Sequence, residues 1–196
     1  MQCKCGALLK LGKFAEALKA FDAFPEQTAS QRYERAYCLY RLRRFDEATR
    51  ALDAVPAAER TEGFLHLQAQ VLYQSGQYAA AAELYERHFA SASAADLDAE
   101  LKANIVAAFV SAGQPQKVAT FLRQCGHREG AADETYELAY NVACALADLG
   151  DLAAARLRLE GALATGERAL RADGLRYHAG RTSQTWHMRK CRKYFQ

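Results

Sequence analysis

The sequence predicts an all-α protein built from repeated helical hairpins and followed by a basic tail, and three observations support this. Ala and Leu dominate a chain that is 51% hydrophobic, and only three prolines and twelve glycines occur in its 196 residues, which favours helices over strands. A short, turn-like sequence motif recurs five times along the chain. Positive charge gathers at the C-terminal end. We expect the repeats to span residues 1–170 and the tail to span residues 171–196.

The spacing of the recurring motif gives the repeat length. Its five copies are LGKFAEAL, LRRFDEAT, SGQYAAAA, AGQPQKVA and LGDLAAAR, with turn positions at Gly12, Arg43, Gly76, Gly113 and Gly150. These positions are separated by 31, 33, 37 and 37 residues. The spacings bracket the roughly 34-residue tetratricopeptide period, in which each repeat is a pair of antiparallel helices. The pattern therefore predicts a tetratricopeptide-repeat solenoid of about five helix pairs in a right-handed superhelix.

Each position of the motif has a steric reason. The turn residue ends the first helix in a left-handed conformation that suits glycine, so Arg43 forms its turn at a modest cost. The aromatic residue after the turn, Phe14, Phe45 or Tyr78, is expected to wedge between the helices. Small residues mark the closest helix crossings; they are Ala17, Ala48, Ala81 and Ala155 on second helices and Ala36, Ala69 and Ala143 on first helices. The stretches 90–100 and 124–134 are expected to be spacer loops or partner contacts.

A solenoid of this kind exposes a concave surface lined mainly by the first helix of each repeat. Tyrosine suits a peptide-binding surface because it offers a large area and a hydrogen-bonding tip with little rotamer entropy to lose. The alternative is that some of these rings pack between neighbouring repeats. The inward-facing candidates are Tyr33, Tyr37, Tyr40, Arg41, His66, Gln70, Tyr73, Gln74 and Tyr140.

A narrower binding role, the grip on a chaperone's C-terminal carboxylate, has weaker support. Modules with that role carry a clamp of Lys and Asn on their first three first-helices. Here the corresponding places of the first repeat hold Gln2 and Gly6. Asn104 and Asn141 stand at clamp-like places, but in later repeats and without the lysines, so this is a minor alternative.

Catalysis and cofactor binding find little support. The sequence has no Gly-rich phosphate loop, no nucleophile elbow and no HExxH motif, and its five histidines are isolated. Cys3-x-Cys5 and Cys125-Gly-His127 each lack the second ligand pair that a zinc site requires. We expect a non-catalytic protein with no metal site and no cofactor.

The sequence shows no targeting signal. No charged leader followed by an apolar run stands at the N-terminus, and no apolar run approaches the roughly 20 residues that a membrane-spanning helix needs. We therefore expect a cytoplasmic protein without membrane insertion.

Four longer motifs carry a more specific signal than the repeat period. They are YERAYCLYRLRRFDEA, LHLQAQVLYQSGQYAAAAELYE, LKANIVAAFVSAGQ and TYELAYNVACALADLGDLAAA. In this order they resemble the tetratricopeptide domain of the seventy-two-kilodalton subunit family of the eukaryotic signal recognition particle. The resemblance runs from about Cys3 to about Ala169.

The resemblance implies a function. In that family the domain holds a segment of the sixty-eight-kilodalton subunit in its concave groove, and the pair is mounted on the particle's RNA. The particle binds ribosomes that present signal sequences and delivers them to the endoplasmic reticulum. The resemblance thus implies a scaffold that reaches the ribosome indirectly and associates with the endoplasmic reticulum through the particle.

The C-terminal segment RADGLRYHAGRTSQTWHMRKCRKYFQ has a different composition. It contains seven Lys and Arg residues and one acid, whereas the whole chain has a net charge of +3. Aromatic residues interleave with the basic ones, which suits phosphate contact with base stacking, although a disordered, soluble end is an equal alternative. The candidate RNA contacts are Arg181, Trp186, Arg189, Lys190, Arg192 and Lys193.

Three functions of different classes are therefore open. The first is a scaffold of the signal recognition particle that binds the sixty-eight-kilodalton subunit. The second is a general tetratricopeptide adaptor for another peptide. The third is an RNA-binding protein that acts through its basic tail.

Overall fold

The computed structural model describes residues 2–26, 28, 30–89, 97–127 and 135–173. Every regular element in these residues is a helix, and the helices follow one another in hairpins, which confirms the predicted all-α fold. The chain divides into two compact units, residues 1–84 and 85–196.

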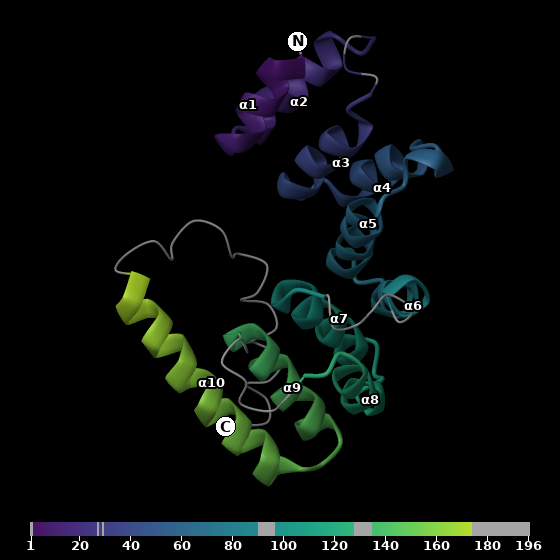
Figure 1. Cartoon of the computed structure of the whole chain (residues 1–196). Helices are drawn as coiled ribbons and strands as arrows, with labels where there is room; N and C mark the ends of the chain where they lie inside the picture. The colour runs from purple at the N-terminus through teal and green to yellow at the C-terminus, as the bar shows by residue number, and fades with distance from the viewer. Residues whose placement is uncertain (1, 27, 29, 90–96, 128–134, 174–196) are drawn as a thin grey trace. The chain divides into compact units, whose positions relative to one another are not determined.

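The first unit holds the first two hairpins and the beginning of a third (Figure 1). A short 3-10 helix, η1 (Ala57–Glu59), stands between the second and third hairpins. Consecutive helices from α1 to α5 pack against one another. These elements are α1 (Gln2–Lys10), α2 (Phe14–Ala23), α3 (Arg32–Arg41), α4 (Phe45–Asp53), α5 (Glu62–Gln74) and α6 (Tyr78–Phe89), the last of which runs into the second unit.

The second unit is organised around α9, which packs against both α7 and α10. Its helices are α7 (Ala99–Ser111), α8 (Gln116–Gln124), α9 (Tyr136–Asp148) and α10 (Leu152–Asp173). The helix α10 continues past residue 170, where the repeats were expected to end. Residues 90–96 and 128–134, within the two expected spacer loops, lie outside the described residues.

The five predicted turns are built alike. All five turn residues have a positive φ, from 60° at Arg43 to 87° at Gly150. After α3 the N–H of Arg43 donates to the carbonyl of Tyr40, and the N–H of Arg44 donates to that of Leu39, each at 2.9 Å. The same pair of bonds closes the other four turns, so each first helix ends in a Schellman motif. A sixth turn of this type at Gly126 ends α8, and the repeat pattern did not predict it.

All seven alanines predicted at the helix crossings are 0% exposed, as close packing at these positions requires. A larger side chain at these sites would separate two helices. In the first unit, larger residues such as Phe21, Leu39 and Phe64 complete the core beside these alanines. The alanines therefore set the helix separation, and the larger residues supply most of the buried apolar area.

Candidate peptide-binding surface

Three candidate tyrosines lie along one face of α3. Tyr33, Tyr37 and Tyr40 are spaced by four and three residues, which places them one above another on the helix. Tyr33 is 38% exposed, whereas Tyr37 and Tyr40 are half-buried against the core of the first unit. The Tyr33 hydroxyl lies 3.8 Å from the place where a Cβ on Gly63 would stand, so its ring reaches the start of α5.

Two of these tyrosines belong to a continuous aromatic row, made of Phe14, Tyr37, Tyr40 and Phe45. The ring centroids of successive members are 5.9, 6.4 and 6.3 Å apart. The first pair is edge-to-face and the other two pairs are tilted, which are favourable arrangements for aromatic side chains. The row joins three helices, because Phe14 belongs to α2, the tyrosines to α3 and Phe45 to α4. The side chains in the row are therefore held in place by packing before any partner binds.

An arginine lies at each end of the aromatic row. The Arg41 guanidinium carbon stands 4.4 Å from the centroid of the Phe14 ring, and its Nη1 donates to the Tyr37 hydroxyl oxygen at 2.7 Å. The Arg43 guanidinium carbon stands 5.5 Å from the centroid of the Phe45 ring. Both arginines are exposed. The Arg41 guanidinium is therefore held by a ring contact and a hydrogen bond, the Arg43 guanidinium has a ring contact, and both keep their charge at the surface.

The candidates on α5 form a second, shorter stripe. Nε2 of Gln70 lies 3.0 Å from Nε2 of His66, and the Tyr73 ring packs edge-to-face on Tyr78 at 5.1 Å. Gln74 is half-buried one residue further along the same helix. Since α3 and α5 are in contact, these side chains and the α3 tyrosines belong to one unit and neighbouring helices.

The remaining candidate, Tyr140, has different surroundings. It lies in the second unit, is 8% exposed and stacks on Tyr136 with 6.0 Å between ring centroids. Burial raises the pKa of Tyr140 to about 12, with a smaller contribution from Tyr136. Burial likewise raises the pKa of Tyr33, with smaller contributions from Tyr37 and Glu34. Both phenols are neutral at physiological pH, but only Tyr33 offers substantial surface to a partner.

Asn141, one of the two clamp-like asparagines, is used inside the protein. It is 9% exposed, and its Nδ2 donates to the carbonyl oxygen of Ala103 at 3.0 Å, which ties α9 to α7. Its amide group is therefore committed to the packing of the second unit.

Sequence reasoning missed part of the surface. It assigned Phe14 and Phe45 only to helix packing, and it treated Arg43 only as an unusual turn residue. The ring of Phe45 does pack on the first helix of its own hairpin, as expected, whereas Phe14 contacts α3 in the next hairpin. The spacing of Tyr37 and Arg41, four residues apart on one helix, was a signal that the two side chains could meet.

A separate groove of about 250 Å³ lies in the second unit between α6, α7 and α8. Buried apolar residues, among them Tyr85, Phe109 and Phe121, line its floor. At its rim the Nζ of Lys117 forms an ion pair with Glu86 at 2.7 Å. This groove contains none of the candidate residues.

The other possible features of this chain are metal binding, membrane spanning and RNA binding. The described part of the chain contains no group of three or more His, Cys, Asp or Glu side chains arranged to hold a metal ion. Within the same residues no helix is long and apolar enough to cross a membrane. The six candidate RNA contacts, from Arg181 to Lys193, lie outside the described residues.

The repeat region is similar to a known protein family. Residues 1–110 match the SRP_TPR_like family model, described as "Putative TPR-like repeat". The chain belongs to this family. The matched residues include the whole aromatic row and both of its arginines.

Three curated relatives are similar over a longer part of the chain, and each is named signal recognition particle subunit SRP72. Those of dog and human are each 33% identical over 175 residues, which is 88% of this chain and 25% of the relative. That of Dictyostelium discoideum is 29% identical over 184 residues, which is 94% of this chain and 26% of the relative. The chain thus spans about a quarter of the length of these relatives.

Proposed function

We propose that this protein is a non-catalytic scaffold subunit of the signal recognition particle. The observation that carries the proposal is its similarity to SRP72 proteins of three organisms over at least 88% of the chain. In this role it holds a segment of the sixty-eight-kilodalton subunit. It works in the cytoplasm, and through the particle it supports co-translational protein targeting to the endoplasmic reticulum.

The first unit supports this proposal with a surface of suitable chemistry. Tyrosine hydroxyls, amides and an arginine stand on the first helices α3 and α5, over rings that are already packed. Half-buried rings with polar tips bind a peptide without ordering new side chains, which keeps the entropy cost of binding low. In our proposal, the partner segment lies along this surface and contacts Tyr33, Tyr37, Tyr40, Arg41, His66, Gln70, Tyr73 and Gln74.

Co-purification tests the proposal most simply. The full chain, immobilised and incubated with purified sixty-eight-kilodalton subunit, is expected to retain it in an approximately one-to-one complex. A reference column should carry an unrelated tetratricopeptide protein. If both columns retain the subunit equally, or neither does, the scaffold assignment is wrong and a general adaptor role takes its place.

The basic tail is proposed to contact the particle's RNA. Truncation after Asp173, where α10 ends, should leave binding of the sixty-eight-kilodalton subunit unchanged. It should weaken RNA binding and flatten its dependence on salt, because fewer phosphate contacts release fewer counterions. Filter binding at several salt concentrations measures this. Loss of the protein partner with unchanged RNA binding would reverse the two assignments.

A further inference from the structure

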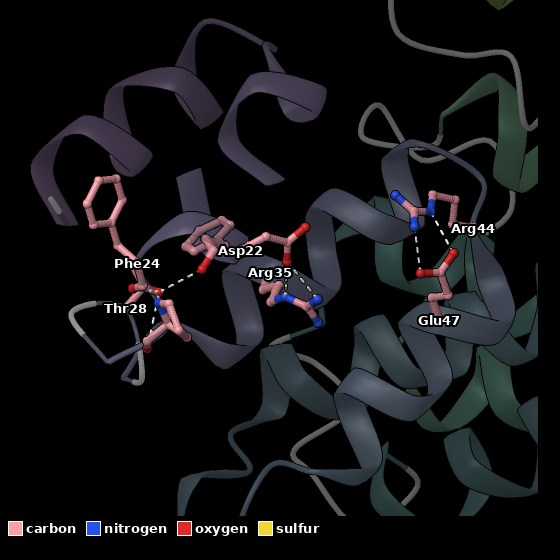
Figure 2. Close-up of polar contacts among 8 residues, drawn as sticks. Asp22, Phe24, Thr28, Arg35, Arg44 and Glu47 are labelled. Carbon is pink, nitrogen blue, oxygen red and sulfur yellow. Dashed lines mark hydrogen bonds and ion pairs between the residues drawn. The ribbon is translucent and has the colours of Figure 1, made fainter. Parts of the chain in front are cut away.

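Five arginines lie on α3 and in the turn that follows it, and they fall into two groups. Three form ion pairs with carboxylates in the same unit; the pairs are Arg32 with Glu59 at 3.2 Å, Arg35 with Asp22 at 2.9 Å and Arg44 with Glu47 at 2.6 Å. Figure 2 shows the last two pairs. The other two, Arg41 and Arg43, lie on aromatic rings, and no described carboxylate pairs with either. The charge of these two arginines is therefore not balanced by an acid of the described chain.

Arg41 is prepared to receive an anion. Its guanidinium carbon lies 4.4 Å from the centroid of the Phe14 ring, and one of its N–H groups donates to the Tyr37 hydroxyl, so most of its five N–H donors are left for a ligand. A guanidinium group with free donors in a fixed plane binds a carboxylate through two parallel hydrogen bonds. The surroundings of Arg41 thus hold its guanidinium group but leave most of its hydrogen-bond donors without an acceptor in the described residues.

Arg43 carries an independent signal in its backbone. Its φ is 60°, whereas the other four hairpin turns place glycine at the same position. A side chain in this left-handed conformation is strained, and such strain persists mainly where the residue has a use. Glycine would form the turn without strain, so the chain retains an arginine there at the expense of stability. Its guanidinium over Phe45 extends the surface of the aromatic row.

We propose that Arg41 and Arg43 bind the carboxylates of an acidic peptide segment that lies along the aromatic row. The inference rests on the proposed function and specifies the chemistry of the partner: the bound segment carries acidic side chains at two places, with apolar residues between them. Arg41 and Arg43 then select the segment, and the rings of the row supply contact area.

The geometry favours a peptide over single-stranded RNA. Bases bind such surfaces by stacking on exposed ring faces. In the aromatic row one face of Phe14 carries Arg41, one face of Phe45 carries Arg43, and all four rings are half-buried against the core. The two end rings therefore have one face covered by a guanidinium group, which leaves less ring surface for bases to stack on and supplies two groups that bind carboxylates.

The test uses a full-length double variant that carries both Arg41→Gln and Arg43→Gln. Its control is the single variant Arg50→Gln. The control removes the charge of an exposed arginine on α4 that lies outside the row. The probes are the purified sixty-eight-kilodalton subunit, a labelled peptide of alternating Glu and Leu, its Gln and Leu counterpart, and oligouridine.

The double variant should bind the subunit and the acidic peptide about tenfold more weakly, and its affinity for them should lose most of its dependence on salt concentration. The Arg50 control should match the unaltered chain.

The variant Arg43→Gly checks folding. Its melting temperature should not fall, because the turn loses its strain, yet it should bind the acidic peptide more weakly than the unaltered chain does. If the subunit binds the double variant as well as the unaltered chain, this inference is overturned while the proposed function stands. If the subunit binds neither chain, the proposed function fails and the acidic peptide decides the inference, which is then overturned by equal binding of the two peptides. Loss of oligouridine binding alone in the double variant would also overturn it, in favour of RNA.

Discussion

The first helices α3 and α9 occupy the same place in their hairpins and differ most in what covers them. In α3 three of ten residues are buried, and its face carries tyrosines and arginines. In α9 nine of thirteen residues are buried, among them Tyr140 and Asn141. The helix α9 packs against α7 and the 22-residue α10, whereas α3 packs mainly against the shorter helices α2 and α4, of 10 and 9 residues, so α9 keeps less of its surface for a partner.

The repeat plan thus determines only part of each hairpin. Turn residues and crossing alanines obey the same plan in both units. The neighbours of a first helix decide how much of its surface is accessible, and the long helix α10 covers much of α9. A partner surface in this chain is therefore expected in the first unit.

The largest effect should come from overpacking a helix crossing. Ala143→Leu should lower the free energy of unfolding by about 3 kcal/mol and Ala48→Leu by about 2 kcal/mol, because nine of the thirteen residues of α9 are buried, against two of the nine in α4. Ala79→Leu, the same change at an exposed site on α6, should alter it by less than about 0.5 kcal/mol. Urea denaturation measures all three. Equal, small losses at the two buried sites would show that the crossings tolerate larger residues.

The next effect concerns binding. Tyr37→Ala together with Tyr73→Ala should weaken binding of the sixty-eight-kilodalton subunit by about 2 kcal/mol, as loss of aromatic anchors does. Tyr140→Phe in the second unit should leave the affinity unchanged, because that side chain is 8% exposed. Titration calorimetry gives both values, and circular dichroism checks that the helices persist. A large loss for Tyr140→Phe with none for the double variant would place the surface in the second unit.

A smaller and equal effect is expected at two helix N-termini. The side chains of Thr61 and Thr135 cap α5 and α9 by accepting from the N–H of Phe64 and Leu138, at 3.3 and 3.2 Å. Replacing either threonine by Ala should lower the free energy of unfolding by about 1 kcal/mol. The comparison of units predicts similar losses, because a cap acts locally. Thermal denaturation would contradict this if one cap proved several times stronger than the other.

The smallest effect has the opposite sign. Arg43→Gly should raise the free energy of unfolding by about 0.5–1 kcal/mol, since glycine adopts the turn's left-handed conformation without strain. The reverse change in the second unit, Gly113→Arg, should lower it by about 1 kcal/mol for the same reason. Chemical denaturation of both variants tests the pair. Destabilisation by Arg43→Gly would mean that the contact with Phe45 outweighs the backbone strain.

The sequence was sufficient for features that each repeat encodes locally. A left-handed turn needs Gly or a strained substitute, and a close crossing needs Ala, so Gly12 and Ala17 could be recognised by type and spacing. The burial of Tyr140 could not be predicted, because it depends on how α10 packs on α9. The contacts of Arg41 and Arg43 with rings were missed because they join three helices, and their partners had been assigned to packing alone.

Photo-cross-linking tests the central claim, that the partner lies on α3 and α5 of the first unit, most directly. A benzophenone amino acid would replace Tyr33, which is 38% exposed on α3, or Leu157, which is 71% exposed on α10. With the purified sixty-eight-kilodalton subunit, illumination should join it to the chain labelled at residue 33 and give little product at residue 157. Cross-linking at residue 157 with none at residue 33 would contradict the assignment of the partner surface to the first unit.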